Sequence, residues 1–513
     1  MLDPTHGLFK FPSKEERRIA RNGAPLNPIK LAMTLTPMQG AMFFSGWFAW
    51  MIDAWDFFAV SLSVTALSVQ FQRPTHDITT AITLTLLFRS VGAAVFGILS
   101  DRYGRRYPLV ANLLLIAAFS LGTGFVQTYP QFLVLRSIFG CLMGGIWSQA
   151  TAVALENMPV APRGLFSGIL QQGYAVGYLL AASVNLSWVQ RTNNWRILFF
   201  LSSGLSALAA LVRLVLPESE LFLRQKAQRD ANGAVGESKA KLFMAELKEM
   251  LKTHWLRCVY GVLLMTGFNF LSHSSQDLYP TMLQKSKLLT EGQASRATII
   301  SNCGAISGGM VAGYLSQYLG RRMTIIVFVL ITGALIPAWI LPNSFSALAA
   351  GAFFLQFGVQ GAWGVVPIYL SEISPPAFRA TYGGLAYQLG NAASSASSQI
   401  EAVGGDNLKD RNPKWYAGAP AGVDEFIPAY ARVSAILLGS VCAYLLVVVT
   451  FGWEFRGAEF ESELPAALHC STEQDSSQLE KQPIHFTQDA DDEHSLEPVH
   501  ERHDKASIDK SKL

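Results

Sequence analysis

The chain has 513 residues, of which 50% are hydrophobic and only 15% charged, and its formal net charge is +3. Soluble domains carry about 25% charged residues. The deficit indicates that lipid is the main solvent, and the small net charge gives no reason to expect a nucleic-acid partner. The five cysteines lack the paired spacing of a disulfide framework or a zinc site, so we expect no metal or other cofactor.

Apolar runs dominate the chain from residue 40 onward. The basic N-terminal stretch has no cleavable apolar core behind it, which argues against a secretory signal peptide. Twelve later runs are long enough to cross a bilayer as helices. They cover approximately residues 40–67, 79–99, 107–127, 131–154, 164–187, 195–216, 257–280, 297–317, 322–342, 346–370, 380–402 and 432–453. The sequence therefore predicts an all-α membrane protein.

A polar segment between the sixth and seventh runs divides the chain into parts. These are an N-terminal tail (1–39), a six-helix half (40–216), a central loop (217–255), a second six-helix half (256–453) and a C-terminal tail (454–513). Lys and Arg gather in the loops on the side of the tails, so both tails and the central loop are expected in the cytoplasm. The polar C-terminal tail is expected to be disordered and available to trafficking or ubiquitination machinery.

The two halves repeat one another. The segment Gly97–Arg106 (GILSDRYGRR) recurs as Gly313–Arg322 (GYLSQYLGRR), displaced by 216 residues. Five further residues recur at the same displacement, namely Glu156, Pro159, Arg163, Gly168 and Gln172. Several matches at one displacement indicate a duplicated six-span unit, and such a duplication is typical of a transporter with its pathway between the halves.

The seventh span carries a polar stripe at helical spacing. Asn269, His273 and Asp277 follow one another at i, i+4 and i+8. The stripe also includes Ser272, Gln276 and Thr281. Lipid cannot satisfy such a face, which must turn toward a water-filled pathway or a polar bundle interior. Because histidine titrates near neutral pH, His273 and Asp277 are candidates for a proton-carrying pair; the alternative is a hydrogen bond that only orients the helix.

The first half offers charged counterparts to this stripe. Arg89 lies about halfway along the second span, where a charge is costly and functional by default. Its guanidinium can hold a carboxylate. The displacement of 216 residues pairs Asp53 with Asn269 and Asp56 with Ser272, so we expect these carboxyls to couple to protons or substrate. The alternative for all three residues is a fixed ion pair.

Four further residues inside predicted spans are candidates for a structural or substrate-binding role. Arg136, in the fourth span, is expected to be structural more than substrate-binding. Gln172 and Gln388 are symmetry-related amides that read substrate length or bridge helices. Pro280 cannot donate to the carbonyl of Gln276, which predicts a kink in the seventh span.

Several of these motifs resemble a known family. The first repeated segment resembles the signature loop of the major facilitator superfamily, with Gly97, Asp101, Arg102, Gly104, Arg105 and Arg106. Gln317 replaces the acid in the second copy, where a weaker charge interaction is expected. The residues from Asn269 to Thr281 fit N-x-x-[ST]-H-x-[ST]-Q-D-x-x-x-T, which resembles the seventh span of fungal lactate/carboxylate permeases, near the sialate:proton symporter branch. The run Tyr387–Ser398 is also similar to that family.

The resemblance implies proton-coupled uptake of short-chain mono- or dicarboxylates across the plasma membrane. The expected substrate-binding residues are Arg89, Asn269, Ser272, His273, Gln276, Thr281, Gln172 and Gln388. The expected proton-coupling residues are Asp53, Asp56, His273 and Asp277. Alternatives are a transporter of sialate, sugars or drugs on the same scaffold, and a non-transporting sensor. An enzyme is not expected, because the loops offer no nucleophile or metal constellation, and no Walker motif occurs.

Overall fold

The computed structural model describes residues 27–454, apart from 157, 160, 221, 224–226, 228–247, 249–250, 375–378 and 413–423. The chain divides into the units Met1–Glu463 and Leu464–Leu513, and all described residues belong to the first. The C-terminal tail beyond residue 454, most of the N-terminal tail and most of the central loop therefore lie outside the described residues. Pro375, the counterpart of Pro159 in the repeat, also lies outside the described residues.

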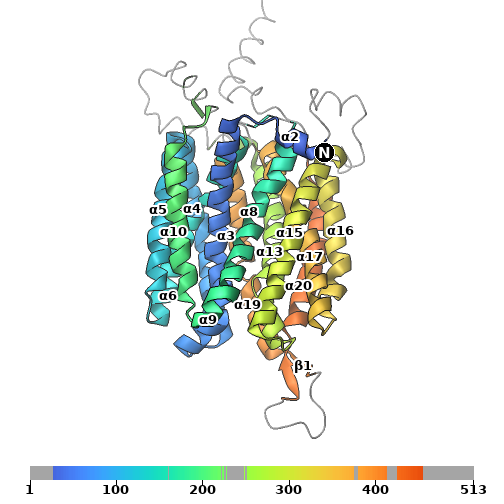
Figure 1. The fold of residues 1–513 in the computed structure, drawn as a ribbon. Coiled ribbons are helices and arrows are strands. Elements are labelled where there is room, and N and C mark those ends of the chain that lie inside the picture. Colours follow the sequence, from blue (N-terminus) through green and yellow to red (C-terminus); the bar gives the residue numbers. More distant parts are fainter. Residues whose placement is uncertain are drawn as a thin grey trace, which may run out of the picture. The chain divides into compact units, whose positions relative to one another are not determined.

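Helices that run side by side make up this unit (Figure 1). In chain order they are α2 (Pro28–Ala32), α3 (Pro37–Phe71), α4 (Thr75–Tyr103), α5 (Arg106–Gly124), α6 (Tyr129–Met143), α7 (Ile146–Leu155), α8 (Arg163–Val184), the π-helical η1 (Asn185–Val189), α9 (Gln190–Thr192), α10 (Arg196–Val215), α13 (Trp255–Gln276), α14 (Tyr279–Lys285), α15 (Glu291–Leu319), α16 (Arg321–Ile340), α17 (Phe345–Ile373), α18 (Arg379–Ser394), α19 (Ser397–Asn407) and α20 (Tyr430–Thr450). A short antiparallel hairpin, β1 (Lys409–Arg411) with β2 (Phe426–Pro428), precedes α20.

Each of the twelve predicted spans corresponds to one of these helical segments. Three spans are interrupted, between α6 and α7, between α13 and α14, and between α18 and α19. The sequence predicted a kink in the span formed by α13 and α14, and it predicted neither of the other two interruptions. Of the described residues, eight helical segments qualify as membrane spans by length and composition alone. The other four spans are α8, α13 with α14, α15, and α18 with α19. They carry many of the buried polar side chains, as expected for helices that line the contact between two halves.

The two halves meet through these polar helices. Helix α8 of the first half packs against α15 and α17 of the second, and α18 of the second half packs against α4 of the first. Small residues allow the close approach. A Cβ on Gly168 of α8 would lie 2.4 Å from the carbonyl oxygen of Gly309 in α15, so only glycine fits there. Glycine therefore sets the close packing of α8 against α15 at this crossing.

The signature loop of the first half is held by buried ion pairs. The Arg105 guanidinium lies 2.7 Å from the Asp101 carboxylate and 2.8 Å from that of Glu156. Burial lowers the pKa of Arg105, but the attraction of Glu156 and Asp101 outweighs it and the pKa is raised overall. The carboxylate of Glu218 accepts from the backbone N–H groups of Arg105 and Arg106. Of the other signature residues, Gly97 is buried and Gly104 has a φ of +105°, which favours glycine, whereas Arg102 is exposed.

The second signature loop repeats this arrangement with one carboxylate fewer. Arg321 lies 2.9 Å from Glu372, and Glu454 accepts from the backbone N–H groups of Arg321 and Arg322. The Ser316 hydroxyl accepts from Arg321 in the place where Asp101 stands in the first loop. Gln317 lies against Gly164 of the other half instead. The second loop therefore has no counterpart of the Arg105–Asp101 ion pair. This agrees with the weaker charge interaction expected from Gln317 in place of an acid.

Candidate functional site

The polar stripe of the seventh span is buried between the two halves. Its residues in α13 and the following turn are at most 4% exposed. The helix ends at Gln276 and restarts at Tyr279, with Pro280 in the first turn of α14. The predicted kink is therefore a full interruption. The Tyr178 hydroxyl of α8 donates to the freed carbonyl of Gln276 at 3.4 Å. Thr281 lies beyond the interruption, buried in α14.

His273 is held on both ring nitrogens. Its Nδ1 lies 3.0 Å from an Asp277 carboxylate oxygen, and its Nε2 lies 3.0 Å from Asn391 Oδ1 in α18. Asn391 Nδ2 donates to Gln388 Oε1 at 2.6 Å, and Gln388 Nε2 donates to the Gly144 carbonyl at 3.1 Å. A continuous hydrogen-bonded chain thus runs from Asp277 in the second half to the gap between α6 and α7 in the first.

Arg89 and Asp53 form a buried ion pair. One guanidinium nitrogen of Arg89 lies 2.5 Å from Asp53 Oδ2, and both side chains are 1% exposed. Arg89 and Asp53 therefore form the ion pair that was the alternative to a substrate-binding role, but only one nitrogen contacts one oxygen. Arg89 Nε and Asp53 Oδ1 have no hydrogen-bond partner among the described residues. Buried polar groups are normally satisfied, so this pair keeps unused capacity for a ligand.

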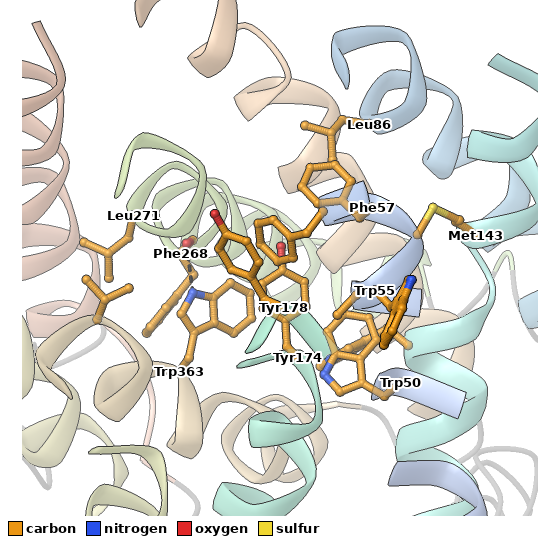
Figure 2. Close-up of a cluster of buried hydrophobic side chains, with 14 of the residues drawn as sticks. Trp50, Trp55, Phe57, Leu86, Met143, Tyr174, Tyr178, Phe268, Leu271 and Trp363 are labelled. Carbon is orange, nitrogen blue, oxygen red and sulfur yellow. Dashed lines mark hydrogen bonds between the residues drawn. The ribbon is translucent and has the colours of Figure 1, made fainter. Parts of the chain in front are cut away.

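Aromatic side chains connect the ion pair to the histidine. The Phe57 ring lies 5.8 Å from the Arg89 guanidinium and 5.7 Å from the His273 ring. The Tyr387 hydroxyl lies within hydrogen-bonding range of Arg89 and Asn391. Figure 2 shows Phe57 among the rings of Tyr174, Tyr178, Trp50 and Trp363, which converge from both halves. The two charged pairs therefore belong to one layer between the halves.

Asp56 turns away from this layer. The Ser120 hydroxyl of α5 donates to one oxygen of its carboxylate at 2.6 Å, and the other oxygen has no hydrogen-bond partner among the described residues. The two aspartates that the sequence placed together therefore have separate partners. Arg136 is fully buried and stacked 4.0 Å from the Phe139 ring centroid, and its guanidinium nitrogens have no hydrogen-bond partner among the described residues. Its electrostatic partners are Asp56 and Asp53.

The remaining amides of the predicted site lie in different places. Asn269 Nδ2 donates to the Tyr387 carbonyl at 3.1 Å, which fixes α13 against α18. Gln172 lies against Gly309 of α15, and both of its amide atoms lack a partner among the described residues. Gln172 therefore does not take part in the hydrogen-bonded chain that contains Gln388, its counterpart in the repeat.

A cluster of polar and aromatic side chains packs beside the stripe. Gln276 Nε2 donates to Gln356 Oε1 at 2.7 Å, and Ser272 Oγ accepts from Gln360 at 3.4 Å. The side chains beside Gln276 pack so closely that they leave no room for a water molecule. This cluster includes polar and aromatic side chains of α8, α13, α15 and α17, among them Tyr178, Ser301, Asn302 and Gln356.

Sequence reasoning missed several of these residues. Gln356 and Gln360 stand at i and i+4 in an apolar span, and such intramembrane polar residues are costly and mark functional sites. Asn391 stands at i+3 from Gln388, within the run already singled out. In the structure, Gln356, Gln360 and Asn391 all hydrogen-bond to residues of the stripe in the seventh span.

A family model described as the Major Facilitator Superfamily matches residues 41–398. The chain belongs to the major facilitator superfamily. A "Carboxylic acid transporter protein homolog" of Saccharomyces cerevisiae is 38% identical over 441 residues, which cover 84% of this chain and 70% of that protein. The "Cis,cis-muconate transport protein" of Acinetobacter baylyi is 24% identical, with 71% and 87% covered. The "Sialic acid transporter NanX" of Escherichia coli is also 24% identical, with 71% and 86% covered.

Solved structures of this superfamily share the fold. The xylose transporter XylE from E. coli, in a partially occluded inward-open conformation, superposes with a TM-score of 0.61 over 83% of this chain and all of that chain. XylE bound to 6-bromo-6-deoxy-D-glucose gives 0.64 over 83% and 98%. Both are 18% identical, so they show the fold alone. The predicted family and the fold with two six-helix halves are confirmed, and the chain is a membrane transporter and not an enzyme.

Proposed function

We propose that this transporter imports short-chain carboxylates together with protons across the plasma membrane, with its termini in the cytoplasm. The solutes are monocarboxylates such as lactate, dicarboxylates such as succinate, or both. The names of its relatives support a carboxylate, since muconate and sialic acid each carry a carboxyl group. The buried chain around His273 supports the coupling to protons.

The direction of the hydrogen bonds in this chain leaves a place for one proton. The Gly144 carbonyl can only accept, so Gln388 presents Nε2 to it and Oε1 to Asn391. Asn391 then presents Oδ1 to His273, whose Nε2 must donate. A neutral imidazole would therefore face the Asp277 carboxylate with an unprotonated Nδ1. Two acceptors 3.0 Å apart require a shared proton, and this proton is the one that the transport cycle would load and release.

Arg89 supplies the charge for the substrate anion. A carboxylate that enters the layer can bind the guanidinium at Nε, which the contact with Asp53 leaves unused. The Tyr387 hydroxyl lies between Arg89 and Asn391, so the anion and the proton site share a neighbour. An anion bound there favours the protonated His273–Asp277 pair by electrostatic attraction. Binding of one then strengthens binding of the other.

Alternating access requires that contacts at one end of the bundle break while those at the other end hold. At the end where α14 and α4 meet, Lys285 Nζ lies 2.5 Å from Thr75 Oγ1. At the end that carries the signature loops, the Ser167 hydroxyl of α8 donates to the Gly364 carbonyl of α17 at 3.1 Å. Both sets are formed here, so the arrangement corresponds to an occluded step of the proposed cycle.

The decisive measurement is alkalinisation of the medium when carboxylate is added to cells that lack other permeases. We expect Asp277→Asn and His273→Ala each to reduce the initial rate about 100-fold or more, as when a positioned proton carrier is removed. Ser275→Ala is the matched control. Its hydroxyl donates to the backbone carbonyls of Leu271 and Ser272 in its own helix, and uptake should stay near the wild-type rate.

Two outcomes would contradict the proposal in different ways. Unchanged alkalinisation in both variants would show that the proton is carried elsewhere. Failure of the wild type to accumulate either labelled lactate or labelled succinate, at acidic and at neutral external pH, would show that the substrate class is wrong.

A further inference from the structure

A buried polar stripe continues along the eleventh span beyond the site described above. Starting from Gln388, polar residues follow at helical spacings of three or four residues. They are Gln388, Asn391, Ser394, Ser398 and Glu401, and each is at most 1% exposed. The stripe crosses the interruption between α18 and α19 and ends in a carboxyl group. Buried carboxyls are rare in membrane spans and mark ion or proton pathways.

Glu401 has no cationic partner among the described residues. It forms no ion pair there, its Oε1 atom has no hydrogen-bond partner, and Ser434 of α20 provides a hydrogen bond to the carboxyl group. The other ionisable group that acts on it is Asp277 of α13, whose charge is repulsive. A buried carboxylate without a cation is unstable. Glu401 therefore holds a proton in this arrangement whenever Asp277 is charged.

Ionisable groups on the elements packed against α19 lie toward its outer end. Helix α20 presents Tyr430, whose hydroxyl donates to Asp406 at 2.6 Å. Helix α4 presents His76, 3.9 Å from Asp406. Lys285 of α14 lies 5.9 Å from the Tyr430 ring centroid. Strand β2 contains no ionisable side chain. The Asp406 side chain is 34% exposed, so the end of α19 that follows Glu401 reaches solvent.

We propose that Glu401 is a second proton-binding carboxyl, which passes protons between the outer surface and the His273–Asp277 pair. The proton leaves the Glu401 hydroxyl and binds an Asp277 oxygen, and the negative charge moves from Asp277 to Glu401. Solvent then restores the proton on Glu401 through the end of α19 near Asp406. The inference rests on the proposed proton coupling, and it adds the route by which the proton arrives.

The first test compares two modes of transport in vesicles that contain the purified full-length chain. Uptake driven by a pH gradient needs net proton movement, whereas exchange of labelled for unlabelled lactate at equal pH does not. Glu401→Gln keeps the shape and the bond to Ser434 but cannot release a proton. We expect gradient-driven uptake to fall about tenfold or more, with exchange within about twofold of the wild type.

The matched control is Ser434→Ala, which removes the hydrogen bond but leaves the carboxyl. It should retain gradient-driven uptake. If Glu401→Gln retains gradient-driven uptake, or loses exchange to the same extent, Glu401 is not a proton carrier. A wild type that exchanges lactate but never responds to a pH gradient would instead contradict the proposed coupling itself, and the role of Glu401 with it.

A second measurement needs no variant of this residue. Dicyclohexylcarbodiimide reacts with protonated carboxyls in apolar surroundings, and mass spectrometry locates the adduct. We expect an adduct on Glu401 of the wild type at acidic pH, less of it at alkaline pH, and parallel loss of gradient-driven uptake. Absence of the adduct at every pH, in protein that still exchanges lactate, would overturn the proposal.

Discussion

The two halves descend from one repeated unit, yet they meet with different chemistry. The first half contributes a closed ion pair, Asp53 with Arg89, whose charges compensate each other. The second half contributes His273 and Asp277, whose side chains lie 3.0 Å apart, and a chain of amides that orients the hydrogen bonds to His273. In the proposed function, Arg89 of this ion pair offers its positive charge to the substrate anion on one side of the layer, and the His273–Asp277 pair is the group that changes its charge on the other.

This difference shows what duplication makes possible. A symmetric pair of sites would bind two similar ligands, whereas these two walls suit an anion and a proton. If the walls bind an anion and a proton as proposed, electrostatic attraction makes each ligand strengthen the binding of the other, which is the thermodynamic requirement for coupling. Variants that alter the Asp53–Arg89 pair and leave the residues around His273 intact, or the reverse, test this difference.

The largest expected effect is at the ion pair. Arg89→Ala leaves the buried Asp53 carboxylate without its ion-pair partner, so we expect about 3–5 kcal/mol of destabilisation and loss of uptake. Thermal unfolding in detergent and uptake of labelled lactate measure the two effects. The double variant Asp53→Asn with Arg89→Gln removes both charges, and we expect it to recover most of the stability.

The double variant decides between structure and binding. If Arg89 only balances Asp53, uptake should return together with stability. If it binds the substrate anion, the protein should unfold near the wild-type temperature and still fail to transport. Wild-type uptake by the double variant would remove Arg89 from the proposed site.

The sequence predicted the fold well because its signals are local. Apolar length defines the spans and the common displacement defines the halves. The stripe from Asn269 to Asp277 was also visible, because helical spacing alone brings its residues to one face. Contacts between helices were beyond reach. Nothing in the sequence showed that Asp56 would turn to Ser120, or that Asn391 would hold His273.

The burial of Glu401 could not be predicted from the sequence either. As one glutamate near the end of a predicted span, it could equally have lain in the outer loop. Its burial depends on the interruption between α18 and α19 and on the packing of α20. Span boundaries inferred from apolar length are uncertain by several residues, which is enough to move such a residue from the membrane into water.

A smaller effect is expected on the amide chain of the second half. Asn391→Leu removes the acceptor of His273 Nε2 and the donor to Gln388, and an unsatisfied buried group costs about 1–3 kcal/mol. The pH dependence of uptake should change, because the imidazole ring is no longer oriented toward Asp277. Asn302→Leu is the matched control. Its amide donates within its own helix, so stability should fall while the pH profile stays unchanged.

The smallest effect concerns the signature loops, where the halves differ by one acid. Gln317→Asp gives the second loop the carboxylate that the first loop has at Asp101, next to Arg321. We expect a gain of about 0–1 kcal/mol in the free energy of unfolding, measured by thermal unfolding. The reverse change, Asp101→Gln, breaks a buried pair with Arg105 and should cost more than the new pair gains.

The asymmetry between these two variants follows from the partners already present. Arg321 is satisfied by Glu372 and by the Ser316 hydroxyl, so an added acid only supplements existing bonds. Arg105 uses Asp101 directly, so its removal leaves a donor unpaired. Equal and opposite effects of the two variants would mean that the loops are interchangeable. In that case the loss of the acid in the second loop would have no structural consequence, and the difference between the halves would be confined to the layer around Arg89 and His273.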